Sequence, residues 1–167
     1  MRSPSLRSQS GFTIVETIIV LAIAGIILLI VLLAIPVLKR NSTNNQRTQD
    51  VQTVLQAVST YELNHSGTIP NTVNLHNFLN TYEKNKLTYY DLNNRNSIRV
   101  STPNATDTLQ TYPPVTTPIT LDNMLVNNHA KCVPGGTATN QGAGYSDVVA
   151  LYAIETASGS VPHCQQL

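Results

Sequence analysis

Hydrophobic and polar residues separate along this chain into one unbroken apolar segment and a longer, mostly polar remainder. From Thr17 to Leu38 there is no charged side chain, and most positions are Ile, Leu, Val or Ala. About 22 residues of helix measure roughly 33 Å, which is enough to cross the hydrocarbon core of a bilayer. We therefore expect residues 12–38 to form a transmembrane helix.

A second pattern predicts that the helix continues as an amphipathic one over residues 39–66. Apolar side chains recur there at helical spacing on one face, at Val51, Val54, Leu55, Val58 and Tyr61. Poor helix formers lie between the two patterns, so a break at Asn44 and Asn45 is an alternative. Asn64 to Gly67, followed by Pro70, is a helix stop signal. The simplest expectation is one helix from Phe12 to about His65.

Residues 67–167 are expected to form a globular head that begins with a short helix. Asn71 is a suitable N-cap for this helix, whose apolar positions are Val73, Leu75, Phe78, Leu79 and Tyr82. Residues 83–121 are polar and predicted to be a long loop, with one candidate strand at residues 97–101. The prolines that interrupt this loop are Pro103, Pro113, Pro114 and Pro118.

A β-sheet is predicted over residues 123–165. The run from Asp147 to Thr156 is rich in β-formers and mostly apolar, which favours a central strand. We expect a strand from Asn123 to Val133 before it and a Gly-rich loop from Thr137 to Tyr145 between the two. Val161 to Gln165 is expected to be a short edge strand.

Composition and motifs argue against several classes of function. The 167 residues include 10 basic and 9 acidic side chains, with no basic cluster among aromatic residues that would indicate a nucleic-acid site. There is no phosphate loop and no nucleophile elbow. The histidines lack zinc-ligand spacing and are expected to be solvated or in turns: His65, His76, His129 and His163. We expect no cofactor, no metal and no enzymatic activity.

The charges on either side of the apolar segment bear on its orientation. Arg2 and Arg7 place the amino terminus in the cytoplasm by the positive-inside rule, whereas Lys39 and Arg40 argue the opposite way. Because the first flank usually dominates, we expect a cytoplasmic amino terminus and an external head.

The two cysteines, Cys132 and Cys164, both follow the apolar segment. In an oxidising compartment a disulfide between them is the first expectation. It would close a loop of about 32 residues and stabilise the fold by roughly 3–4 kcal/mol in the chain-entropy description. The alternative is a pair of unpaired buried thiols.

Glu16 is an unexpected carboxylate at the start of the apolar segment, because a charge in hydrocarbon is costly and tends to mark function. With the charged leader and the uncharged helix, the run from Gly11 to Glu16, GFTIVE, resembles the start of type IV pilin precursors. The resemblance implies that a prepilin peptidase cuts between Gly11 and Phe12, removing a leader of residues 1–11, and that Phe12 becomes N-methylated. It also implies that Glu16 meets the free amine of a neighbouring subunit and sets the register of assembly. The alternative is a solvated carboxylate at a helix N-terminus, where acids are favoured.

Within the apolar helix, Ala22, Ala24 and Gly25 form a patch of small residues that would let neighbouring helices approach closely. Ordinary membrane-helix composition is the alternative explanation. Gly25 falls where the family often has a glycine. Pro36 follows eleven residues later, whereas the family's proline follows after about eight, and it is expected to kink or loosen the helix by removing a backbone bond.

The resemblance implies an α+β fold in which a long amino-terminal helix packs on a small antiparallel sheet, with a disulfide-bounded terminal loop and a variable surface segment at residues 83–121. It implies the structural subunit of a type IV pilus, first in the inner membrane and then in a surface filament. The implied partners are further copies of the chain, a prepilin peptidase, the pilus assembly machinery and membrane lipid. The alternatives are a pseudopilin of a type II secretion or competence system and, from a different class, a single-pass membrane protein with a ligand-binding ectodomain. Adhesion, twitching motility, DNA uptake and secretion all use this precursor design.

Overall fold

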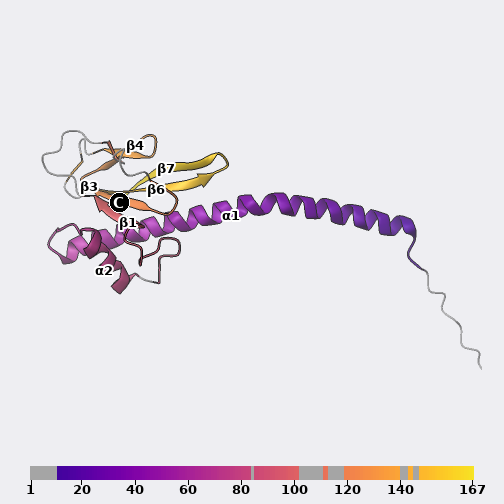
Figure 1. Ribbon diagram of the computed structural model, residues 1–167, viewed down its shortest axis with the longest axis horizontal. Helices are drawn as coiled ribbons and strands as arrows, with labels where there is room; N and C mark the ends of the chain where they lie inside the picture. The colour runs from indigo at the N-terminus through magenta and orange to yellow at the C-terminus, as the bar shows by residue number, and fades with distance from the viewer. Residues whose placement is uncertain (1–10, 84, 102–110, 113–118, 140–142, 145–146) are drawn as a thin grey trace, which may run out of the picture. The chain divides into compact units, whose positions relative to one another are not determined.

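The computed structural model describes residues 11–83, 85–101, 111–112, 119–139, 143–144 and 147–167 (Figure 1). The chain divides into two compact units, Met1–Lys39 and Arg40–Leu167. The amphipathic half of the first helix therefore belongs to the same compact unit as the strands. Residues 1–10 of the predicted leader, residues 1–11, lie outside the described residues.

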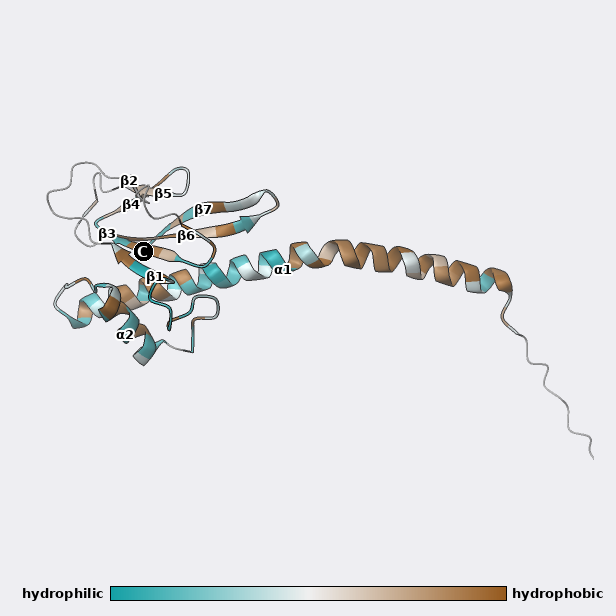
Figure 2. Ribbon diagram, in the orientation of Figure 1, coloured by the Kyte–Doolittle hydropathy of each residue, from teal (hydrophilic) through white to brown (hydrophobic). Residues whose placement is uncertain are grey.

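The first helix, α1, spans Ile14–Asn64 without interruption. Pro36 lies inside it and does not end it, and the break considered at Asn44 and Asn45 does not occur. Figure 2 shows the change in character along α1, from hydrophobic residues in its first half to mixed, more hydrophilic ones in its second. The predicted single long helix is confirmed, with its start two residues later than expected.

The second unit contains one further helix and two sheets. The helix is α2, Thr72–Tyr82, and Asn71 caps it as predicted, because its side-chain oxygen accepts the Asn74 N–H at 2.8 Å. A four-stranded sheet has the order β1-β3-β6-β7 and a three-stranded sheet has the order β2-β5-β4. The strands are β1 (Ile98–Ser101), β2 (Thr111–Tyr112), β3 (Met124–Asn128), β4 (Lys131–Val133), β5 (Thr137–Thr139), β6 (Val148–Thr156) and β7 (Gly159–Gln166).

Strand β6 is central in the larger sheet and β7 is its edge strand, as the sequence predicted. The predicted α+β fold with a small, mainly antiparallel sheet is confirmed, and the structure adds one parallel pair, β1 with β3, in which Ile98 lies opposite Met124. A parallel pair needs a long connection of a dozen residues or more, and residues 102–123 between these strands provide it. The fold is α+β with a mixed sheet.

Two strand boundaries differ from those expected. The predicted strand from Asn123 to Val133 is split between the two sheets, because His129 adopts a φ of 55° and turns the chain. Thr137–Thr139, predicted to be loop, forms β5 and pairs with β4 through the turn at Gly135 and Gly136. A side chain at Gly136 would collide with the carbonyl of Pro162, so only glycine fits there.

The core of this unit lies on both faces of the larger sheet. On one face, the predicted apolar stripe of α1 is buried with Leu75 and Leu79 of α2 and alternate residues of β3 and β6. On the other face, Val149 and Leu151 of β6 pack with Ala138 of β5. Because β6 is covered on both faces, its sequence is apolar at successive positions rather than alternating.

The segment expected to be a long surface loop, residues 83–121, is in part buried. Tyr90, Leu92 and Ile98 belong to the main core, and burial raises the pKa of the Tyr90 hydroxyl. The four predicted loop prolines lie outside the described residues.

Candidate functional site

The bond between Gly11 and Phe12 lies in the non-helical chain just before α1 begins. Both residues are exposed, with Phe12 86% accessible, and no atom lies within 4 Å of a Cβ built on Gly11. A peptide bond in this setting is sterically open to an enzyme that cleaves it.

Thr13 and Glu16 form a reciprocal cap at the start of α1. The Glu16 N–H donates to the Thr13 hydroxyl oxygen at 3.3 Å. In return the Glu16 carboxylate accepts the Thr13 N–H at 3.2 Å and the Thr13 hydroxyl at 3.1 Å. This is a capping box, with Thr13 at the N-cap and Glu16 three residues later.

The cap gives Glu16 a role in its own chain besides any role in assembly. Both hydrogen bonds reach one oxygen, Oε2, and a carboxylate has about four acceptor positions, so acceptor capacity remains for a cation. Thr13 was missed from the sequence, although its spacing from Glu16 is the signature of a capping box. The considered alternative, an acid suited to a helix N-terminus, describes one part of what Glu16 does.

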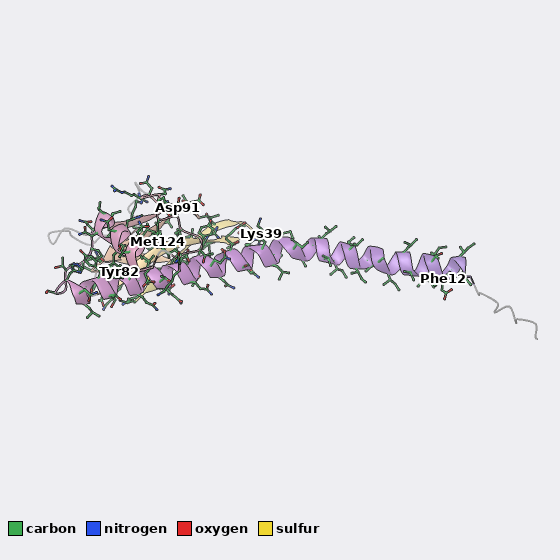
Figure 3. All side chains as sticks on the ribbon, turned by 90° about the horizontal axis from the view of Figure 1, so that it is seen from below. Phe12, Lys39, Tyr82, Asp91 and Met124 are labelled. Carbon is green, nitrogen blue, oxygen red and sulfur yellow. A yellow bond between two sulfur atoms is a disulfide. The ribbon has the colours of Figure 1, made fainter. Side chains whose placement is uncertain are left out.

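The helix surface that follows is apolar on every side. None of residues 12–38 is buried, and Figure 3 shows side chains projecting all around the helix between Phe12 and Lys39. Among the described residues, α1 is the one helix long and apolar enough to cross a membrane, judged by length and composition. Ala22, Gly25 and Pro36 lie within this exposed surface, and open space surrounds Gly25.

A disulfide joins Cys132 to Cys164 in the structure, the pair expected from the sequence. Cys132 lies in β4 and Cys164 in β7, so the bond links the smaller sheet to the edge of the larger one; the two Cα atoms are 5.6 Å apart. Nearby, the Gly144 N–H and then Lys131 hold the pKa of the Asp147 carboxyl below its usual value.

Asp50, in the second half of α1, is a buried anchor that sequence reasoning missed. It is 1% exposed, and its carboxylate accepts the backbone N–H groups of three consecutive residues, at distances of 2.6–3.0 Å: Thr88, Tyr89 and Tyr90. One carboxylate thereby fixes the start of the segment that was expected to be a surface loop.

Asn44 and Arg47 make a second polar contact from the same helix face. The Asn44 amide donates to the Glu155 carbonyl at 2.8 Å and accepts the Glu155 N–H at 2.9 Å. Arg47, which is 2% exposed, donates to Asn44 at 2.8 Å and to the Tyr89 hydroxyl at 2.6 Å. Positions 44, 47 and 50 follow one another at intervals of three residues, and 47 and 50 each precede a residue of the apolar stripe by four. This helical spacing places them beside the stripe and could have indicated the buried polar contacts.

The histidines do not gather at one place. His76 is buried, and its ring nitrogens lie 3.2 Å from the Leu92 carbonyl and 2.7 Å from the Ile98 carbonyl. The expectation that it is solvated or in a turn is therefore wrong. His65 stacks on Tyr61 with ring centroids 3.8 Å apart. Within the described part of the chain, no three His, Cys, Asp or Glu side chains are placed to hold a metal ion.

Comparison with known families identifies the amino-terminal segment. Residues 6–32 match the prokaryotic N-terminal methylation motif, a range that includes the predicted cleavage position between Gly11 and Phe12, the capping box and most of the exposed apolar helix. No curated protein and no solved structure matches the chain. This motif, together with the long apolar helix and the α+β fold of residues 40–167, supports a protein similar to type IV pilins and prepilins.

Proposed function

We propose that this chain is the structural subunit of a type IV pilus. The observation that carries the proposal is the surface of residues 12–38, which is apolar and exposed on all sides and directly follows the methylation-motif junction. Such a surface needs lipid or other helices around it. A prepilin peptidase cuts between Gly11 and Phe12, Phe12 is N-methylated, and the subunits then polymerise through this helix.

Assembly exchanges lipid contact for helix–helix contact and gives Glu16 a cation. An unpaired carboxylate in an apolar filament core is strongly disfavoured, and an opposite charge offsets much of that cost. The free acceptor capacity of Glu16 suits the amine that cleavage creates at Phe12 of a neighbouring subunit. The small residues Ala22, Ala24 and Gly25 suit close approach of neighbouring helices.

The proposal also specifies how the chain is oriented in the membrane, and it assigns the chain a structural role rather than an enzymatic one. The precursor has its amino terminus in the cytoplasm and its second unit outside the inner membrane, and the filament stands on the cell surface. The disulfide between Cys132 and Cys164 supports an oxidising location for that unit. The partners are sister subunits, the peptidase, the assembly machinery and, before assembly, lipid.

The deciding experiment is electron microscopy of material sheared from the cell surface, with intact-mass analysis of this chain in it. We expect filaments that contain a chain starting at N-methylated Phe12. A processed chain that stays in the cell envelope and is absent from sheared filaments would instead indicate a pseudopilin. An uncut chain would overturn the proposal in favour of an anchored membrane protein.

A further inference from the structure

A groove is lined by the end of α1 and by α2, which lies close to that end of α1 in Figure 1. It is open to solvent and has a volume of about 450 Å³. Its lining residues are Tyr61 and Asn64 from the end of α1, His65 directly after that helix, and Asn74, Asn77, Phe78, Thr81 and Tyr82 from α2. All of them are described residues, and the methylation motif at residues 6–32 does not account for any of them.

Four rings form a continuous series along this groove. His65 stacks on Tyr61 with centroids 3.8 Å apart, Tyr61 meets Phe78 edge-on at 5.7 Å, and Phe78 contacts Tyr82 at 4.7 Å. Tyr61, the second ring of the series, is almost buried, whereas Tyr82 at one end of it is 66% exposed. The inner rings hold the outer ones in place, so the exposed aromatic surface costs little further ordering when a ligand covers it.

Polar groups without protein partners flank the rings. Among the described residues, the side-chain amides of Asn64, Asn74 and Asn77 make no hydrogen bond. Each amide offers two donors and an acceptor. The Nδ1 atom of His65 lies 2.8 Å from the Tyr61 carbonyl oxygen, so in the neutral ring Nδ1 carries the hydrogen and Nε2 is left as an acceptor.

The lining of the groove carries almost no charge, and this limits the chemical class of ligand that it can bind. Apart from the imidazole of His65, no lining residue is ionisable near neutral pH, and none is Lys, Arg, Asp or Glu. A nucleic acid or an acidic polymer would need cations beside the rings. A cationic ligand would need carboxylates. Flat aromatic surface bordered by neutral amides suits a molecule with apolar C–H faces and hydroxyl edges.

We propose that this groove binds a neutral oligosaccharide. The C–H face of one pyranose ring lies on Tyr82, and hydroxyl groups of sugar units further along the oligosaccharide exchange hydrogen bonds with the amides of Asn77 and Asn74, because eight residues of helix separate Asn74 from Tyr82 by about 12 Å. The spacing of positions 74, 77, 78, 81 and 82 places these side chains on one face of α2. This binding role does not depend on the proposed assembly function, because it uses no residue of the apolar helix.

The test is saturation-transfer NMR of the mature full-length chain in detergent micelles with neutral oligosaccharides. The probes are chitotetraose, maltotetraose and cellotetraose at millimolar concentration, with a sialylated tetrasaccharide as the acidic comparison. We expect transfer to ring C–H protons of at least one neutral probe and none to the acidic one. Tyr82→Ala should weaken that binding about tenfold, through loss of the aromatic platform, and Asn77→Ala should weaken it severalfold.

Two matched variants outside the groove serve as controls. Leu63→Ala removes an apolar side chain that is 82% exposed on α1, and Asn80→Ala removes an exposed amide on α2; neither residue lines the groove. Both should bind like the parent chain. The proposal is overturned if no neutral probe binds, if Tyr82→Ala binds normally, or if Leu63→Ala weakens binding equally. It is also overturned if Tyr82→Ala instead prevents subunits from assembling without any saccharide being bound, since the groove would then be a subunit interface.

Discussion

At the scale of single residues, Glu16 has one role that the structure shows and one that we propose. Its carboxylate caps α1 through Thr13, and in the proposed filament its charge would pair with the amine of a neighbouring subunit. A capping box needs an acceptor at this position, which Gln also supplies, whereas an ion pair needs the negative charge. The two roles are therefore separable by mutation.

Glu16→Gln should keep the start of α1 and lose filament incorporation, because it retains the cap acceptor and removes the charge. Thr13→Ala is the matched opposite: it removes the cap, at a cost of about 1 kcal/mol to the helix, and keeps the carboxylate. Far-UV circular dichroism of the detergent-solubilised subunit reports the helix, and immunoblots of sheared material report incorporation. Normal filaments from Glu16→Gln would contradict the pairing role. The role would also be contradicted if Thr13→Ala lost its filaments while Glu16→Gln kept them.

At the scale of elements, the sequence correctly predicted the features that depend on the spacing of residues close together in the chain. The apolar stripe of α1, the cap at Asn71 and the central strand β6 all follow from patterns within a few residues. Strand β5 and the parallel pairing of β1 did not, because both depend on contacts between residues far apart in the chain. Asn44 and Asn45 looked like a weak point for the same reason: the Asn44 amide is satisfied by Glu155, and Asp50 further along the helix by residues 88–90, which no local pattern reveals.

Asp50→Ala tests whether this polar face holds the second unit together. The substitution leaves the N–H groups of Thr88, Tyr89 and Tyr90 without their acceptor, and an unsatisfied buried donor costs about 1–3 kcal/mol. We expect the free energy of unfolding to fall by roughly 3 kcal/mol or more in chemical denaturation. The neighbouring exposed residue gives the control, since Gln49→Ala should change it by less than about 0.5 kcal/mol. Equal stability of the two variants would show that the backbone of residues 88–90 is held by other contacts.

At the scale of the whole molecule, the two compact units differ in whether they bury their own apolar side chains. Arg40–Leu167 buries its apolar side chains within itself, on both faces of its larger sheet. Met1–Lys39 buries none of its described residues, so its apolar surface is left for lipid or for other copies. The near-zero mean hydropathy of the chain, −0.05, averages these two regimes and describes neither.

Gly25→Leu distinguishes the requirements of the apolar helix in the membrane from its requirements in the proposed filament. Open space around Gly25 in the single chain means that a larger side chain meets no obstacle there, and Leu is also a better helix former by about 1 kcal/mol. Membrane insertion should therefore be unchanged, whereas close approach of neighbouring helices at the Ala22–Gly25 patch should be blocked and filament yield should fall severalfold. Ala34→Leu is the matched control, because it makes a comparable enlargement at an exposed position outside that patch. Membrane fractionation and quantification of sheared filaments measure the two effects, and an undiminished filament yield from Gly25→Leu would mean that subunits do not pack through this patch.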